Sequence, residues 1–344
     1  MPQVRHGLTF GDIFTAEDGT PYQPNEPQQL LHQHSQGVGV YVLEAPMGLG
    51  KTEAALYAAY KMLEEGKATG IYFALPTQLT SNKLLDRFNG YLKQILTAES
   101  PHRHSLLLHG SAWLVNQEWG EEGKPGRSWF DSAKRGLLAP FAVGTLDQAL
   151  MAAMNVKHGF VRAFGLAGKV VILDEVHSYD AYTGVILDEL IRLLRTLHCT
   201  VIILSATLSQ ARRSELLGQP AQRDAYPLIS VSPGITPSPL QELPVTPEAS
   251  RAVHLQCKAM ADQTVLEEVL KRAAQDQQVL WIENTVAEAQ ERYLDLAARA
   301  QELGVACGLL HSRFTALHRQ KTRLIGLAAM AKWAELLAGS KGAF

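Results

Sequence analysis

The sequence predicts an α/β protein, in which a doubly wound parallel sheet domain is followed by an incomplete second domain of the same kind. Up to about residue 210, short apolar runs alternate with helical stretches, and each run is apolar on both faces. Strands of this kind are typical of a parallel sheet that helices cover on both sides. The predicted strands of the first domain are Val40–Leu43, Ile71–Leu75, Ser105–Leu108, Phe141–Val143, Val170–Leu173 and Val201–Leu204.

The pattern changes near residue 218. The segment Gly218–Pro247 is rich in proline, which excludes a long helix and indicates an irregular connector with a short strand at Leu228–Val231. A second, shorter α/β pattern follows. It comprises helix Asp262–Ala274, strand Val279–Ile282, helix Val286–Ala300 and strand Val305–Leu310.

From these changes we expect five parts in the chain. They are an N-terminal linker (1–27), a first domain (28–215), a connector (216–275), a partial second domain (276–323) and a divergent tail (324–344). The tail is rich in Ala and Leu and carries no further strand–helix pair, so we expect it to be poorly packed.

Composition limits the class of protein. The formal net charge is -2, so nucleic-acid binding would have to come from local patches rather than from a basic surface. The three cysteines are far apart in the sequence, which fits neither a disulfide framework nor a zinc site. The sequence has neither an apolar run of about 18 residues nor a signal peptide, so we expect a cytoplasmic protein without membrane contact.

The strongest motif lies between the predicted strand Val40–Leu43 and a run of strong helix formers. Glycines in such a turn let successive backbone N–H groups face phosphate oxygens, and the helix N-terminus adds its positive end. Lys51 would bridge the β- and γ-phosphates, and the Thr52 hydroxyl would bind Mg²⁺. This predicts an ATP site whose loop is Ala45, Pro46, Met47, Gly48, Leu49, Gly50, Lys51 and Thr52.

A second motif follows the strand Val170–Leu173, where Asp174 and Glu175 stand side by side. Ligands of open α/β sheets bind at the carboxyl ends of the strands, which places these acids beside the phosphate loop. Asp174 would hold Mg²⁺, and Glu175 would orient and deprotonate the attacking water. His177 either reports the nucleotide state to a facing domain or packs at the end of the strand.

A third motif, Ser205-Ala206-Thr207, follows the strand Val201–Leu204. Its hydroxyls could bond the Asp-Glu segment and pass the nucleotide state towards a substrate channel. Alone it is weak, because Ser or Thr after a strand is usually a helix N-cap.

Taken in order, these three motifs resemble a superfamily 2 helicase motor. Further segments are similar to the CRISPR-associated helicase–nuclease of type I interference systems, and the resemblance covers about residues 10–323. The segments that carry it are Phe73–Gln78, Gly144–Gln148, Asp174–Asp180, Glu283–Val286 and Leu309–Phe314. The resemblance implies two RecA-like domains and ATP-driven 3′-to-5′ translocation on single-stranded DNA. It also implies recruitment by a guide-RNA surveillance complex.

The resemblance also implies roles for single residues. Gln28 lies where such motors place an adenine-reading glutamine, although Gln29 competes for that role. Residues from both domains fall where such motors contact the DNA backbone. For each of these residues, a turn, cap or surface role is the alternative. They are Pro76, Thr77, Gln78, Thr145, Asp147, Asn284, Thr285, His311 and Arg313.

The sequence departs from the family in two places. It has no His-Asp dipeptide, so the family's nuclease domain is not expected in this chain. After Arg313 it also lacks the glutamine- and arginine-containing segment that supplies an arginine finger. An arginine finger contributes roughly 10³–10⁵ in rate, so we expect the chain to bind ATP better than it hydrolyses it. The alternative to a motor is a nucleotide-binding remnant, or one piece of a split motor completed by a separate chain that carries the missing half and the nuclease.

Overall fold

The computed structural model describes residues 2–16, 18–108, 136–154, 156, 159–176, 181–236, 239–246, 257 and 259–314. The chain divides into two compact units, Met1–Ser250 and Arg251–Phe344. In the described residues, no helix has both the length and the hydropathy of a membrane span.

The first unit is built on one eight-stranded sheet with the strand order β3-β4-β2-β5-β6-β1-β7-β8, as far as its residues are described. All neighbouring strands run parallel from β3 to β1, whereas β7 and β8 are antiparallel to their neighbours. The strands are β1 (Gly39–Glu44), β2 (Ile71–Leu75), β3 (Leu106–Leu108), β4 (Phe141–Thr145), β5 (Val170–Asp174), β6 (Thr200–Ser205), β7 (Leu228–Pro233) and β8 (Gln241–Pro244).

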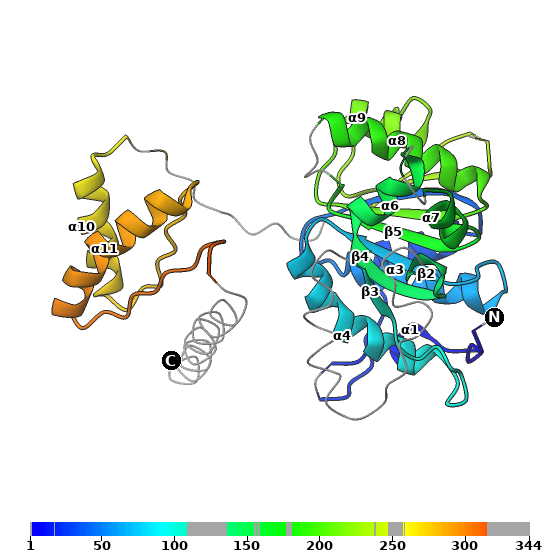
Figure 1. Ribbon diagram of the computed structural model, residues 1–344, viewed down its shortest axis with the longest axis horizontal. Helices are drawn as coiled ribbons and strands as arrows, with labels where there is room; N and C mark the ends of the chain where they lie inside the picture. Colours follow the sequence, from blue (N-terminus) through cyan, green and yellow to red (C-terminus); the bar gives the residue numbers. More distant parts are fainter. Residues whose placement is uncertain are drawn as a thin grey trace. The chain divides into compact units, whose positions relative to one another are not determined.

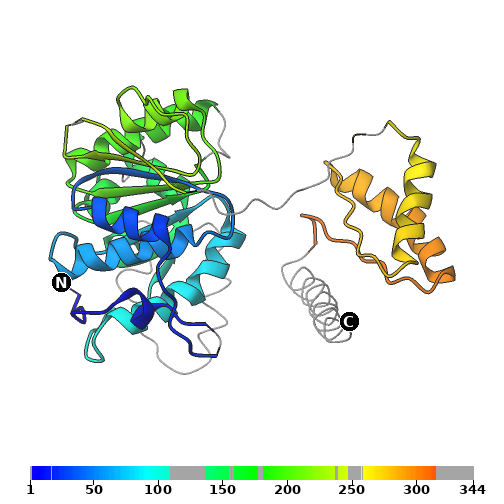
Figure 2. The same cartoon turned by 180° about the vertical axis from the view of Figure 1, so that it is seen from behind.

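Helices cover both faces of this sheet (Figures 1 and 2). One core cluster joins α1, α2, α3 and α4 to one face, and a second joins α6, α7, α8 and α9 to the other. Alternate strand residues divide between the two clusters, so that Tyr41 belongs to the first and Val42 to the second. The helices are α1 (Phe10–Ile13), α2 (Glu26–His34), α3 (Lys51–Glu64), α4 (Gln78–Ile95), η1 (Gly136–Leu138), α6 (Leu146–Ala153), α7 (Gly159–Leu166), α8 (Ala181–Thr196) and α9 (Gln210–Leu217).

The predicted doubly wound α/β fold is confirmed, and each strand expected in the first domain is present. The sheet continues beyond these strands, because the segment expected to be an irregular connector supplies β7 and β8. β7 contains the short strand expected at Leu228–Val231. β8 was not expected, since its sequence Gln-Glu-Leu-Pro is polar and its residues are partly exposed at the edge of the sheet.

The second unit contains helices α10 (Asp262–Ala273) and α11 (Val286–Glu302), which match the expected helices. The strands predicted at Val279–Ile282 and Val305–Leu310 are absent: the structure assigns no ladder to either segment. Leu280 and Ile282 are 82% and 77% exposed. An apolar run forms a strand only where neighbouring strands pair its backbone, and no described residue of this unit is in a strand. The tail 324–344 lies outside the described residues.

Candidate functional site

The phosphate loop connects the end of β1 to the start of α3. Gly48 and Gly50 have φ of +88° and +70°, a region that residues with a Cβ rarely adopt. Gly50 is also the N-cap of α3, with no side chain capping the helix, so the first N–H groups of α3 remain for a ligand. Pro46, Met47 and Gly48 are exposed and Leu49 is buried. The loop therefore has the backbone shape and the helix N-terminus that an anion requires.

Lys51, the first residue of α3, is folded back onto its own loop. Its Nζ donates to the carbonyl of Ala45 at 2.6 Å and to that of Pro46 at 3.3 Å. Burial lowers the pKa of this ammonium, while the charges of Glu175 and Asp174 act in the opposite direction. The lysine expected to bind phosphates therefore lies near the acids expected beside it. Thr52 is the next residue of the helix and is partly buried.

Asp174 is the last residue of β5. In the sheet, β6 lies between β5 and β1, the strand that precedes the phosphate loop. Burial, and secondly the charge of Glu175, raise the pKa of this carboxyl to about 6. Its Oδ1 accepts the N–H of Glu175 at 3.0 Å. Glu175 has φ +55°, an uncommon value for a residue with a side chain, and backbone strain of this kind concentrates at functional sites. His177 lies outside the described residues.

Helix α2 supports the loop from the other side. The Gln28 side chain donates to the carbonyl of Gly50 at 3.2 Å, and Asn25 donates to that of Leu49 at 3.1 Å. Both side chains also form the capping box of α2. Gln28 is buried, whereas Gln29 is exposed and donates to Pro24. Of the two glutamines that the sequence left open, Gln28 is the one that bonds to the phosphate loop. The role of Asn25 was missed, although Asn-x-x-Gln before a helix is a capping signal.

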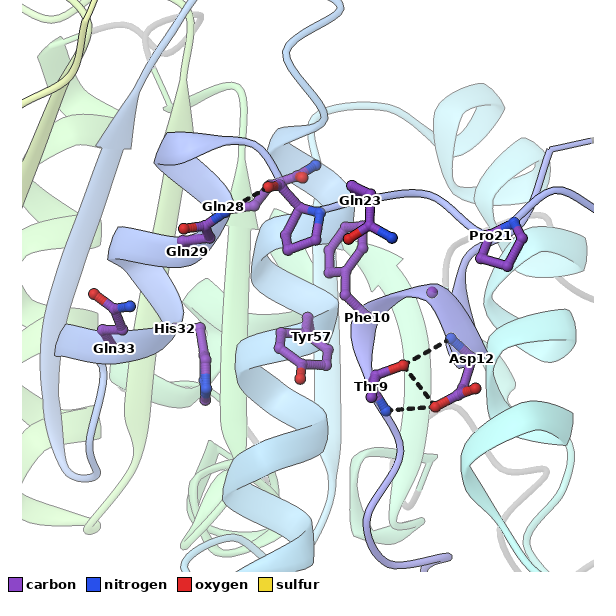
Figure 3. A pocket seen from close by; sticks show the side chains of 12 residues that line it. Thr9, Phe10, Asp12, Pro21, Gln23, Gln28, Gln29, His32, Gln33 and Tyr57 are labelled. Atoms are coloured by element: carbon purple, nitrogen blue, oxygen red, sulfur yellow. Dashed lines mark hydrogen bonds between the residues drawn. The ribbon is translucent and has the colours of Figure 1, made fainter.

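A hollow of about 500 Å³ lies beside Gln28 (Figure 3). Helix α2 lines it with Gln28, Gln29, His32 and Gln33, and Tyr57 of α3 and Phe10 of α1 close other sides. Burial lowers the pKa of His32, which disfavours the charged form of its ring. Aromatic and amide groups of this kind suit a planar ligand, and the lining also includes the carboxylate of Asp12.

Ser205 ends β6 and is fully buried, while Thr207 is exposed. The Ser205 hydroxyl donates to the carbonyl of Thr207 at 3.1 Å, which shapes the turn between them. The N–H of Ala45 donates to the carbonyl of Ser205 at 3.2 Å. The start of the phosphate loop is therefore joined directly to the Ser-Ala-Thr segment.

The DNA-contact candidates of the first unit lie at the same edge of the sheet, where β2 and β4 end. Thr77 is exposed and caps α4 by accepting the N–H of Thr80. Thr145 is buried, and its carbonyl accepts the hydroxyl of Tyr72 at 2.8 Å. Pro76 is partly exposed and Asp147 is exposed in the first turn of α6. Gln78 begins α4.

The candidates of the second unit are arranged around α11. Thr285 caps this helix and forms a capping box with Glu288. His311 lies 3.1 Å from the Gln290 side chain and stacks on Phe314 with ring centroids 4.2 Å apart. Asn284 and Arg313 are exposed. Thr285 thus has the cap role that was its alternative, and its hydroxyl is already bonded.

A parallel sheet with a glycine phosphate loop after one strand and an acid pair after another defines a nucleotide-binding motor of the helicase type. The chain belongs to the DEAD/DEAH box helicase family, whose model matches residues 21–215. A second model, described as the C-terminal part of the CRISPR-associated nuclease/helicase Cas3, matches residues 275–332.

The relatives are Cas3 proteins. The chain is 42% identical over 228 residues to the CRISPR-associated endonuclease/helicase Cas3 of Thermus thermophilus, covering 60% of this chain and 24% of that protein. It is 32% identical over 327 residues to that of Escherichia coli K12, covering 87% and 36%. Among solved structures it resembles T. fusca Cas3-ATP, with a TM-score of 0.77, 32% identity, and 93% and 39% of the two chains covered. The chain thus spans roughly a quarter to a third of the length of the curated relatives it matches.

Proposed function

We propose that this chain is the ATP-driven motor part of a Cas3-type helicase that moves along single-stranded DNA. The observation that carries the proposal is the arrangement at the carboxyl edge of the sheet. There Lys51 follows a loop whose glycines have positive φ. The charges of Asp174 and Glu175, at the end of another strand, favour its ammonium form. A structure of the T. fusca relative is described as an ATP complex.

In this proposal Gly48, Gly50 and the first turn of α3 bind the phosphates through backbone N–H groups. Lys51 exchanges its bonds to the Ala45 and Pro46 carbonyls for bonds to the β- and γ-phosphates. Gln28 reads the adenine, and the hollow beside it has room for a planar base. Glu175 orients the attacking water and accepts its proton.

The residues present fit a magnesium ion. Hard oxygen donors are the ligands that Mg²⁺ prefers, and Asp174 and Thr52 would supply a carboxylate and a hydroxyl. The raised pKa of Asp174 reflects burial and a second carboxylate close by, which a cation would offset. Bound with the nucleotide, magnesium supplies positive charge to the phosphate oxygens.

Single-stranded DNA is the proposed track. Pro76, Thr77, Gln78, Thr145 and Asp147 lie at the edge of the sheet that also carries the phosphate loop. The starts of α4 and α6 offer helix N-termini to backbone phosphates, a contact that carries no sequence preference. Asn284, Thr285, His311 and Arg313 are the proposed contacts of the second unit.

A guide-RNA surveillance complex is the proposed recruiting partner. A chain in a structure described as a CRISPR RNA-guided surveillance complex, pre-nicking, is 32% identical to this one with a TM-score of 0.62. Co-purification of the tagged chain with such a complex tests this part, and a Gly50→Ala chain that still co-purifies would show that recruitment does not need nucleotide.

The second unit favours a further candidate, a nucleotide-binding subunit with little turnover of its own. Its described residues include no strand, and Leu280 and Ile282 are exposed. A separate chain that pairs with this unit would complete the motor. DNA-stimulated phosphate release from the isolated chain separates the two candidates. Turnover that Lys51→Ala abolishes supports the motor, and Lys51-dependent binding without turnover supports the subunit.

A further inference from the structure

A buried cluster of charges lies directly behind the phosphate loop. Glu44 is the last residue of β1, and Arg213 of α9 donates its Nε to the Glu44 carboxylate at 2.5 Å. Both side chains are almost fully buried. The other Glu44 oxygen accepts the N–H of Leu208 at 3.0 Å. One carboxylate therefore joins the base of the phosphate loop to the segment that follows Ser205-Ala206-Thr207.

A third charged group fixes Arg213 in place. Glu242 of β8 lies 3.5 Å from the Arg213 guanidinium and accepts the N–H groups of Gln222 and Arg223 at 2.9 Å each. Arg213 also donates to the carbonyl of Arg223 at 2.7 Å. The guanidinium therefore bonds on more than one side and has little freedom to leave Glu44.

Such a cluster is costly to bury. Burial raises the pKa of the Glu44 carboxyl, which means that the fold disfavours its charged form, although Arg213 offsets part of this. Replacing a buried ion pair by apolar residues of similar size is often neutral or stabilising. Stability alone is therefore a weak reason for these charges. Unlike an apolar side chain, the Glu44 carboxylate makes directional bonds both to the Leu208 amide and to Arg213 of α9.

We propose that Glu44 and Arg213 are positioning residues that hold the Ser205–Leu208 segment against the phosphate loop, so that nucleotide bound at the loop changes the dynamics of that segment. The coupling half of this inference rests on the proposed function. The positioning half concerns the protein without nucleotide. Both halves involve Leu208, whose amide reports on them directly.

The test follows hydrogen exchange at the Leu208 amide in the full chain. Arg213 and Leu208 donate to different oxygens of the Glu44 carboxylate. In Glu44→Gln one of these oxygens becomes an NH2 group, which cannot accept, so the variant loses one of the two present bonds. We expect Leu208 exchange to become about tenfold faster in Glu44→Gln and in Arg213→Met. Arg213→Lys, which keeps a buried cation, should lie closer to the wild type.

Arg195→Met is the matched control. Arg195 is as buried as Arg213 and also holds backbone and side-chain groups of the first unit. It donates to the Gly234 carbonyl and the Ser232 hydroxyl rather than to Glu44. It should destabilise the domain without a selective effect at Leu208. Unchanged Leu208 exchange in Glu44→Gln, or equal acceleration in Arg195→Met, would overturn the positioning role.

The second arm adds a non-hydrolysable ATP analogue at saturation. The wild type should show a change in Leu208 protection that Glu44→Gln loses, while its affinity for the analogue stays within about threefold of the wild type. An equal change in both proteins, or none in the wild type, overturns the coupling. If the wild type binds no analogue, or if binding does not depend on Lys51, the proposed function is refuted and the coupling is refuted with it. Exchange without nucleotide still decides the positioning role in that case.

Discussion

Acidification should weaken nucleotide binding through Asp174. Burial and Glu175 raise the pKa of this carboxyl from 3.8 to about 6, so it is mostly ionised at pH 7 and mostly protonated at pH 5. If the ionised form holds Mg²⁺, the affinity for Mg²⁺-ATP falls about tenfold between these two pH values. Asp174→Asn should bind more weakly at pH 7 and lack this part of the pH dependence.

The same pKa fixes the sign of the effect on stability. Because the folded pKa lies above the unfolded one, the contribution of Asp174 to folding is fully present below pH 3.8 and is lost as pH rises through about 6. At pH 7 the ionised carboxylate therefore costs free energy, at most about 3 kcal/mol. Asp174→Asn should unfold in urea at an equal or higher concentration than the wild type at pH 7.

Titration with a fluorescent ATP analogue at pH 5, 6 and 7 measures the first effect, with and without Mg²⁺. The nucleotide has its own protonation near this range, and it affects both proteins equally. The ratio of wild-type to Asp174→Asn affinity therefore isolates the carboxylate. A ratio that stays constant from pH 5 to pH 7 in the presence of Mg²⁺ would refute the reasoning.

Three further outcomes follow from single contacts. Gly50→Ala places a methyl group against the Gln28 amide and keeps φ at +70°, so analogue affinity should fall at least about tenfold in the same titration. Tyr91→Phe removes a hydroxyl that donates to the Leu56 carbonyl at 2.8 Å inside the core. The free energy of unfolding measured in urea should fall by about 1–2 kcal/mol, and an unchanged urea midpoint would contradict this. Replacing both Leu280 and Ile282 by Ser should reduce concentration-dependent light scattering, since these side chains are exposed. Equal scattering would show that another surface associates.

The first domain could be predicted because its strands are short, apolar on both faces and separated by helix formers. Phe73, for example, lies in an uninterrupted apolar run and is fully buried. The second unit could not be predicted in the same way. Val279–Ile282 has the same apolar character, yet a strand depends on partners that the local sequence does not encode. The polar β8 was missed for the opposite reason, since its pairing with β7 comes from the fold.

Sequence order placed Lys51 near Asp174, because the carboxyl ends of parallel strands meet at one edge. It did not show that Lys51 bonds to its own loop, since side-chain direction depends on the folded backbone. The pair of Glu44 and Arg213 was also beyond sequence reasoning. These residues are separated by 169 positions, and only the sheet register and the packing of α9 bring them together.

One physical feature connects the proposed nucleotide and DNA sites. Helices α3, α4 and α6 all begin at the carboxyl edge of the sheet. Helix α3 follows β1 after the phosphate loop 45–50, α4 begins three residues after the end of β2, and α6 begins directly after β4. A helix N-terminus carries unpaired N–H groups and a positive dipole end, and it binds phosphate whether that phosphate belongs to a nucleotide or to a DNA backbone. Parallel strand direction alone therefore gathers several phosphate-binding helix ends at one edge. Because β1 and β6 are neighbours there and Glu44 accepts the Leu208 amide, the proposed coupling runs from the loop to Ser205 and Leu208. In such a motor the sheet itself sets the distance between the nucleotide site and the DNA site. In our proposal, the buried charges behind the loop determine how rigidly the loop is connected to the segment after β6.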